Sequence, residues 1–290
     1  MSEEFDAWIG IDWSGASGTY KGIALAECTG DAGPRLIAPE GARWTRSGVA
    51  EYLTRRLASG ERLLIGLDFA FSFPWIEGEG YLAGRAPEIT DVFSLWERIE
   101  QASGDAPDHF AGPVVTHEAF APSYWQRGTQ PAGWRNDKRL TETACAEATA
   151  TRPETVFKLI GAKQVGKAAL AGIRTLRAIR LAAPAHVAVW PFETLAGRSA
   201  LVEIYPTLFR RQALGSLTKI KDRATLDRAL AVLGSSASRD VPAQFSDHDG
   251  DALISAAGLR SLDRMGNAFT LAGGAAAQAR YEGWIIGVPS

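Results

Sequence analysis

The chain repeats one pattern, in Trp8-Ile9-Gly10-Ile11-Asp12-Trp13-Ser14 and again in Leu64-Ile65-Gly66-Leu67-Asp68-Phe69-Ala70. Each copy begins as a continuous apolar run, which is typical of a strand buried on both faces. If the two strands are neighbours and parallel, Asp12 and Asp68 leave the sheet at the same level, at the carboxyl ends where open α/β sheets place ligands. Adjacent carboxylates repel unless a cation or a proton separates them. In the alternative reading, each Asp only closes the turn after its strand.

The rest of the chain alternates between strand and helix patterns. We predict strands at 7–11, 22–26, 35–38, 63–67, 187–190, 200–205 and 282–288, and helices around 49–57, 165–181, 208–214, 223–233 and 247–265. Strands that alternate with helices indicate an α/β fold with a mixed sheet flanked by helices.

Residues 71–155 differ in texture from the rest of the chain. Gly, Pro and aromatic residues are crowded there, among them Trp75, Trp96 and Trp125, and no clear periodicity remains. Long loops inside a compact domain are usually functional. We therefore predict a large loop-rich insertion after the fourth strand, within a single domain that spans 1–290.

Composition excludes several classes of protein. The chain has 290 residues, 46% of them hydrophobic and 22% charged, which is in the globular range. Lys plus Arg number 31 against 33 for Asp plus Glu, a formal charge of -2, so no global positive field attracts nucleic acid. Two cysteines and four histidines indicate neither a disulfide scaffold nor a Cys-rich zinc site. No apolar run approaches the ~18 residues of a membrane span and the start is acidic, so we expect a cytoplasmic protein without membrane contact, of unknown oligomeric state.

Three further acidic residues are candidates for a site with Asp12 and Asp68. Glu203 interrupts the apolar strand 200–205, so it either pairs with an Arg, faces that site or lies on an exposed edge. Asp247 and Asp251 are four residues apart and share a helix face. Asp247 alone suits an N-cap. Asp251 begins the apolar face, and the small residues after it would let the helix lie close to the strand ends.

These segments together resemble a known superfamily. An Asp on the first strand, an acid on the fourth and an Asp-x-x-x-Asp-Ala helix start are similar to the ribonuclease H-like superfamily, notably its Holliday-junction-resolvase branch. More narrowly, the chain resembles the family called domain of unknown function 429, which is described as predicted nucleases. The segments that carry this resemblance over nearly the whole chain are Gly10 to Asp12, Asp68 to Pro74, Val189 to Phe192, Val202 to Pro206 and Asp247 to Ala252. Arg135-Asn136-Asp137 is the best match to an Arg-and-acid motif of that family.

The resemblance implies a metal-dependent nuclease or phosphodiesterase. Asp12, Asp68, Glu203 and Asp251 would be catalytic, and these four with Asp247 would hold two Mg²⁺ or Mn²⁺ ions about 3.5–4 Å apart that activate water. Oxygen ligands suit such hard cations. His248 either shuttles a proton or is only a helix-start residue.

One local patch would suit a polyanion. If residues 163–180 are treated as one helix, Lys163, Lys167, Arg174 and Arg177 fall within one stripe, and residues 158–180 hold six positive residues and no acidic ones. We expect either a substrate-binding face for nucleic acid or a solvated charged face.

Two other classes of function remain open. An actin- or sugar-kinase-like ATPase or phosphotransferase has the same kind of fold, and residues 12–18, Asp-Trp-Ser-Gly-Ala-Ser-Gly, would wrap a phosphate. Such enzymes usually have two such domains, whereas the chain has one complete set of strands. A non-catalytic binding protein on this fold is the third class, because fold does not determine function.

Overall fold

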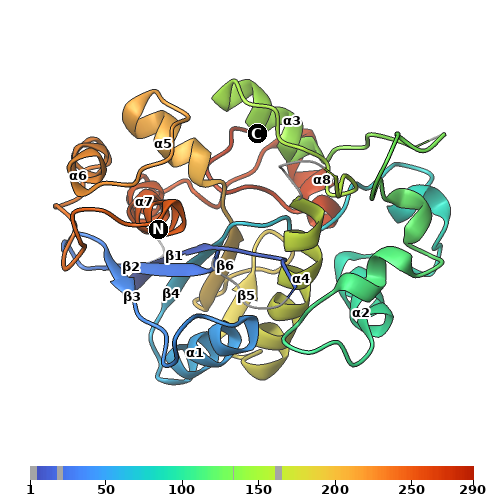
Figure 1. Cartoon of the computed structure of the whole chain (residues 1–290), viewed down its shortest axis with the longest axis horizontal. Coiled ribbons are helices and arrows are strands. Elements are labelled where there is room, and N and C mark those ends of the chain that lie inside the picture. The colour runs from blue at the N-terminus through green and yellow to red at the C-terminus, as the bar shows by residue number, and fades with distance from the viewer. Residues whose placement is uncertain (1–4, 18–21, 133, 161–164) are drawn as a thin grey trace.

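The computed structural model describes residues 5–17, 22–132, 134–160 and 165–290. Its strands are β1 (Ala7–Asp12), β2 (Ala24–Thr29), β3 (Arg35–Ile37), β4 (Leu63–Leu67), β5 (Val187–Val189) and β6 (Ser199–Glu203). Its α-helices are α1 (Arg46–Ala58), α2 (Val92–Ser103), α3 (Leu140–Thr149), α4 (Val165–Ala182), α5 (Pro206–Leu214), α6 (Arg223–Val232), α7 (Asp247–Arg264) and α8 (Gly273–Glu282). Figure 1 shows their arrangement.

The strands form one mixed sheet within the described residues, in the order β3-β2-β1-β4-β6-β5. The β1–β2 and β2–β3 pairs are antiparallel, and the β1–β4, β4–β6 and β5–β6 pairs are parallel. Three antiparallel strands followed by parallel ones confirm the predicted α/β class and mixed sheet, and this order is compatible with a ribonuclease H-like fold.

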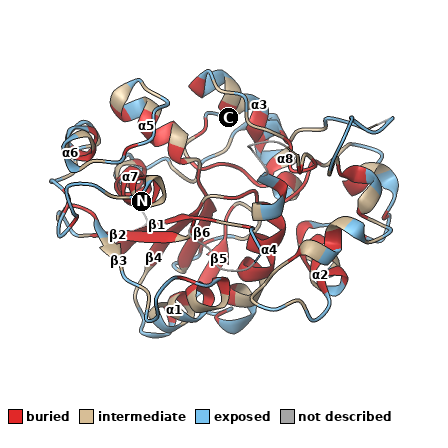
Figure 2. Cartoon of the chain, viewed as in Figure 1, coloured by how far each residue is buried: buried red, intermediate tan, exposed pale blue. Residues whose placement is uncertain are grey.

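Helices cover both faces of the sheet, because residues along each central strand alternate between two apolar cores. Ile9 and Ile11 of β1 belong to one core, with α1, α2 and α4. Trp8 on the same strand faces the other core, with α5, α6, α7 and α8. In Figure 1 α7 lies on one side of the sheet and α1 on the other, and Figure 2 shows the strands between them buried.

Helix α7 lies very close to the middle of the sheet. A Cβ at Gly10 of β1 would lie 2.5 Å from the carbonyl oxygen of Ala252 and 2.6 Å from the amide nitrogen of Ala256. Both neighbours belong to α7, so only glycine on the strand and small residues on the helix permit this contact. The close approach brings the amino end of α7 to the carboxyl end of β1, as the small residues predicted.

The segment 71–155 is more regular than its composition suggested. It contains α2 and α3 besides three short 3₁₀ turns. The buried residues of α2 include Val92, Leu95, Trp96 and Ile99. This spacing of three and four residues is a helical pattern that our reading of the sequence missed among the aromatic and Pro residues.

The carboxyl-terminal part differs from the prediction. Residues 282–288 are not a strand, since only Ile285 forms an isolated bridge, with Glu203 of β6. Helix α8 precedes them and was not predicted. Its sequence GGAAAQARYE has few apolar residues large enough to create a visible stripe, so its amphipathic pattern is weak.

The longest helices of the described chain are α4 and α7, with 18 residues each. Both carry charged residues along their length, and each packs on one face of the sheet. No helix among the described residues is long and apolar enough to cross a membrane.

Candidate carboxylate site

Asp12 and Asp68 end two neighbouring strands. Ile11 of β1 is in register with Leu67 of the parallel β4, so the two Asp residues follow at the same level. The amide of Asp68 donates to the Ile11 carbonyl oxygen at 3.0 Å, which continues the ladder to this point. The repeated sequence pattern therefore predicted this juxtaposition correctly.

Helix α7 adds two more side chains. Its N-cap is Ser246, whose hydroxyl accepts from the Asp249 amide while the Asp249 carboxylate bonds back in a capping box. Asp247, which the sequence suggested as the cap, is the first helical residue instead. His248 lies further along the first turn, and its Nδ1 is 2.7 Å from Oδ2 of Asp12. His248 is thus more than a helix-start residue.

Asp251 lies one turn further along α7 and is fully buried. Arg210 of α5 donates to its Oδ1, and Lys219, in the connection between α5 and α6, donates to its Oδ2. The Arg210 side chain is only 3% exposed, whereas that of Lys219 is 44% exposed. Both oxygens of Asp251 are therefore neutralised by cations of the protein, one of them anchored and one accessible to solvent.

Asp68 has no such partner. Its carboxylate makes no hydrogen bond or ion pair with any other described residue. Burial, followed by the charges of Asp12 and Asp251, raises the pKa of Asp68 well above the ordinary Asp value. An unpartnered carboxylate that feels two other negative charges favours the binding of a proton or a cation at that position.

Asp12 and His248 form a coupled pair. Burial raises the pKa of Asp12, and the Asp251 charge adds to this, although the hydrogen bond from His248 opposes it. The same hydrogen bond and the Asp12 charge raise the pKa of His248 above the ordinary His value, against the effect of burial. The pair therefore favours a protonated imidazole that donates from Nδ1 to Asp12.

Glu203 has an Arg partner, one of the alternatives that its sequence left open. Arg139 donates to its two carboxylate oxygens at 2.8 and 2.6 Å, and the Phe71 amide donates to it at 3.2 Å. Arg139 also donates to Glu142 at 3.1 Å and to the Glu282 carbonyl oxygen at 3.0 Å. This buried network connects β6 to α3 and α8, and it leaves Glu203 committed to Arg139.

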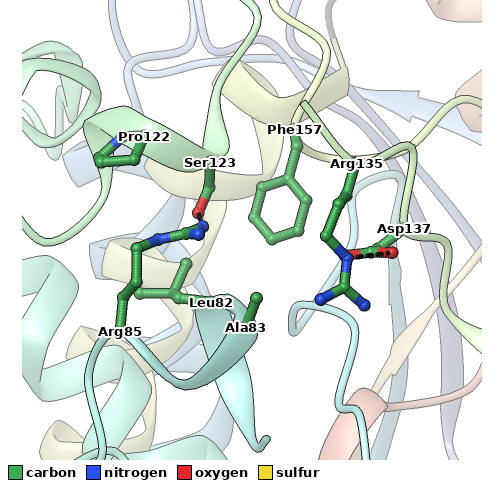
Figure 3. Close-up of a pocket in the computed structure, with 8 residues that line it drawn as sticks. All are labelled: Leu82, Ala83, Arg85, Pro122, Ser123, Arg135, Asp137 and Phe157. Atoms are coloured by element: carbon green, nitrogen blue, oxygen red, sulfur yellow. Dashed lines mark hydrogen bonds and ion pairs between the residues drawn. The ribbon is translucent and has the colours of Figure 1, made fainter. Parts of the chain in front are cut away.

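Sequence reasoning did not single out Arg139, and the match of Arg135-Asn136-Asp137 to the family motif stays a prediction. Arg135 lies on the surface, where it pairs with Asp137 at 3.0 Å and with Glu79 at 2.6 Å. Figure 3 shows Arg135 and Asp137 beside a small cavity of about 30 Å³, whose lining contains none of the predicted site residues. The Arg139–Glu142 pair at a spacing of three residues was the available signal.

A cleft of about 850 Å³ opens beside the carboxylates. Asp68, Glu203 and Asp251 line it, together with Arg210 and Lys219. Its apolar wall includes Trp13 and Phe69, which follow Asp12 and Asp68 in the repeated pattern and whose ring centroids are 5.2 Å apart. The volume is in the range of small-molecule sites.

The oxygen donors suit a hard divalent cation, but the cluster is not a complete cage. No group of three or more His, Cys, Asp or Glu side chains in the described part of the chain could hold a metal ion. Asp12 and Asp68 nevertheless fit an ion such as Mg²⁺, which binds through one or two carboxylates and keeps several waters. Asp251 would join them only by exchanging Lys219 for the ion.

The predicted basic stripe is partly consumed by ion pairs. Arg174 is 5% exposed and donates to both carboxylate oxygens of Glu100 at 2.9 and 2.8 Å. Arg177 pairs with Glu97, and both glutamates belong to α2. Lys167 is exposed, whereas Lys163 lies outside the described residues. Arg174 and Arg177 thus attach α2 to α4, and of the three stripe residues that the structure describes, Lys167 is the one whose charge is not taken up by α2.

Comparison of the chain with protein-family models, with curated proteins and with solved structures finds no match. The geometry of the site is therefore the basis for the function proposed below.

Proposed function

We propose that this protein is a metal-dependent hydrolase that cleaves phosphodiester bonds, with nucleic acid as the substrate class. The observation that carries the proposal is the carboxylate of Asp68, which has no partner among the described residues, lies beside Asp12 at the carboxyl ends of two parallel strands and feels the charge of Asp251 on α7. The strand order, which is compatible with a ribonuclease H-like fold, and the sequence resemblance support the same chemistry.

Asp12 and Asp68 would hold the first Mg²⁺ or Mn²⁺ ion. A bound ion supplies a water of lowered pKa and stabilises negative charge on the reacting phosphate. Holding the second ion of the two-metal scheme would require a third carboxylate, and Asp251 is the candidate because its charge acts on both Asp12 and Asp68. Glu203 and Asp247 would then act from outside the ion's immediate contacts, Glu203 through Arg139 and Asp247 from the first turn of α7.

The cations of the cleft would bind the substrate. Lys219 is the more exposed of the two partners of Asp251, so it can turn from that carboxylate to a phosphate oxygen while Arg210 keeps Asp251 neutralised. Arg210 also donates to Thr207 at 2.6 Å, which fixes its position. Anchored and movable cations together suit a polyanionic ligand.

His248 would transfer a proton. Its Nδ1 is hydrogen-bonded to Asp12 and its side chain is 38% exposed, so Nε2 is the nitrogen that can exchange a proton with water or substrate. In its neutral form the imidazole accepts a proton at Nε2, and Asp12 holds the ring in place.

Calorimetric titration with Mn²⁺ tests this proposal. Wild type should bind Mn²⁺, and Asp68→Asn should not. Asp91→Asn is the matched control, since Asp91 is an exposed N-cap of α2 where Asn caps equally well. Mn²⁺-dependent cleavage of single-stranded DNA, RNA or a branched duplex should follow the same pattern.

Two results would contradict the proposal. If Asp68→Asn bound Mn²⁺ as wild type does, the carboxylate site would not be the metal site. If wild type bound no Mn²⁺ at millimolar concentrations, the non-catalytic alternative would be favoured instead.

A further inference from the structure

We propose that the loop of residues 14–17, together with Lys167, forms a phosphate-binding subsite beside the carboxylate cleft. The 14–17 loop follows β1 directly after Asp12 and Trp13. The subsite requires no metal ion, and it goes beyond the hydrolase activity proposed above.

A buried guanidinium holds the 14–17 loop by its carbonyl groups. Arg46, the first residue of α1, has no exposed surface. Its Nη1 donates to the Ser14 carbonyl oxygen at 2.8 Å, and Nη1 and Nη2 donate to the Ala16 carbonyl oxygen at 3.2 Å each. Its Nε donates to the Asp108 carbonyl oxygen at 2.8 Å, which fixes the guanidinium against the segment after α2. A different loop conformation would leave the buried guanidinium of Arg46 without these acceptors, so the loop is costly to rearrange.

The direction of these carbonyls determines where the neighbouring amides point. In a trans peptide the C=O and the N–H of the next residue point in opposite directions. The carbonyls of Ser14 and Ala16 point to Arg46, so the amides of Gly15 and Ser17 point away from it. Neither amide has a hydrogen-bond partner among the described residues, whereas the Ala16 amide donates to the Ser14 hydroxyl at 3.3 Å. Two free amides on one side of a rigid loop are anion-binding groups.

A cavity of about 480 Å³ lies against the 14–17 loop, and all four loop residues line it. Lys167 of α4 lines the same cavity, and its side chain is exposed. Loop and helix are in direct backbone contact there, because a Cβ at Gly15 would lie 2.0 Å from the Lys167 carbonyl oxygen. The cavity is therefore bordered both by an exposed lysine and by the loop that carries the two unpartnered amides.

A phosphate group is the ligand that fits these features. Amides donate to its oxygens, and an exposed ammonium neutralises its charge. Trp13 and Ala168 line both this cavity and the 850 Å³ cleft, so a ligand bound here would reach towards the carboxylates. The phosphate belongs either to the backbone of a nucleic acid or to a free nucleotide, and the two sources share this chemistry.

Titration of inorganic phosphate into the ¹⁵N-labelled full chain, with EDTA present, tests the subsite. The amide signals of Gly15 and Ser17 should shift, and Lys167→Ala should weaken binding about tenfold, as expected for loss of a charge-assisted bond. Lys221→Ala removes another exposed lysine, far from the 14–17 loop in sequence and absent from the cavity lining, and should bind like wild type. Phosphate binding by Asp68→Asn should also be unchanged, which separates the subsite from the metal site.

Two further probes identify the source of the phosphate. ATP and a single-stranded dinucleotide are titrated separately, and the tighter of the two indicates the natural ligand class. Gly15→Ala should abolish binding of both, because the added methyl group displaces the loop from α4. The proposal is overturned if phosphate leaves the Gly15 and Ser17 signals unmoved, or if Lys167→Ala binds as tightly as wild type.

Discussion

Asp68→Asn should make the protein more stable while it removes metal binding. The Asp68 carboxylate has no partner among the described residues, and burial and two neighbouring acids raise its pKa. Asn keeps the size of the side chain and stays polar, so the gain comes from removing the repulsion by Asp12 and Asp251, which is on the order of 1 kcal/mol per neighbour for a carboxylate at the edge of a cleft. A gain of this size raises the melting temperature of a domain this large by several degrees, at about 2–4 °C per kcal/mol.

The gain should depend on pH. Because the pKa of Asp68 is higher in the folded than in the unfolded chain, the folded protein holds this proton more tightly, and the charge is destabilising above the folded pKa. The difference in free energy of unfolding between Asp68→Asn and wild type should be fully present above the folded pKa. It should disappear as the pH falls through that value to the ordinary Asp pKa.

Urea unfolding at a series of pH values measures this difference, with Asp91→Asn as the control that should not change stability. In a second series, Mn²⁺ at 100 times its dissociation constant should stabilise wild type by about 2.7 kcal/mol and leave Asp68→Asn unaffected. If Asp68→Asn were less stable than wild type at neutral pH without metal, the reasoning would be wrong. Asp68 would then have a stabilising partner.

Three other variants test the surrounding groups. Lys219→Ala should tighten Mn²⁺ binding several-fold, because it removes a cation whose interaction with Asp251 is worth ~1 kcal/mol and competes with the metal ion. Calorimetry would measure this effect, with Lys221→Ala as the control. Weaker binding would mean that Lys219 organises the site. His248→Gln should cost at most about 1 kcal/mol of stability at pH 6, because the raised His pKa makes the ion pair with Asp12 complete below the ordinary His value. The ion-pair part of this cost should be lost as the pH rises through the raised pKa of His248. A loss that is independent of pH would exclude this ion pair. Arg139→Met should lower the free energy of unfolding, measured with urea, by about 3–5 kcal/mol, because Glu203 and Glu142 lose their buried partner. Adding Glu203→Gln to this variant should recover part of the loss. Strictly additive losses would contradict the network.

Much of the fold was readable from local sequence patterns. The strands at β1 and β4 are continuous apolar runs, and the helix of α7 starts with acids and continues with small residues, so each pattern depends only on neighbouring residues. The paired Asp12 and Asp68 were predictable for the same reason, since a repeated pattern on adjacent parallel strands places equal positions at equal height. Where the pattern was weak, as in α8, or obscured by aromatic residues, as in α2, prediction failed.

What each charged group does was decided by the tertiary structure. The sequence shows that Glu203, Arg174 and Asp251 are charged and lie within apolar patterns, but their partners Arg139, Glu100 and Lys219 are 64, 74 and 32 residues away along the chain. Ion pairs over such separations depend on which helices the sheet brings together, and no local periodicity encodes them. The same holds for Arg46, whose contacts with the 14–17 loop exist only because α1 and β1 meet across the core.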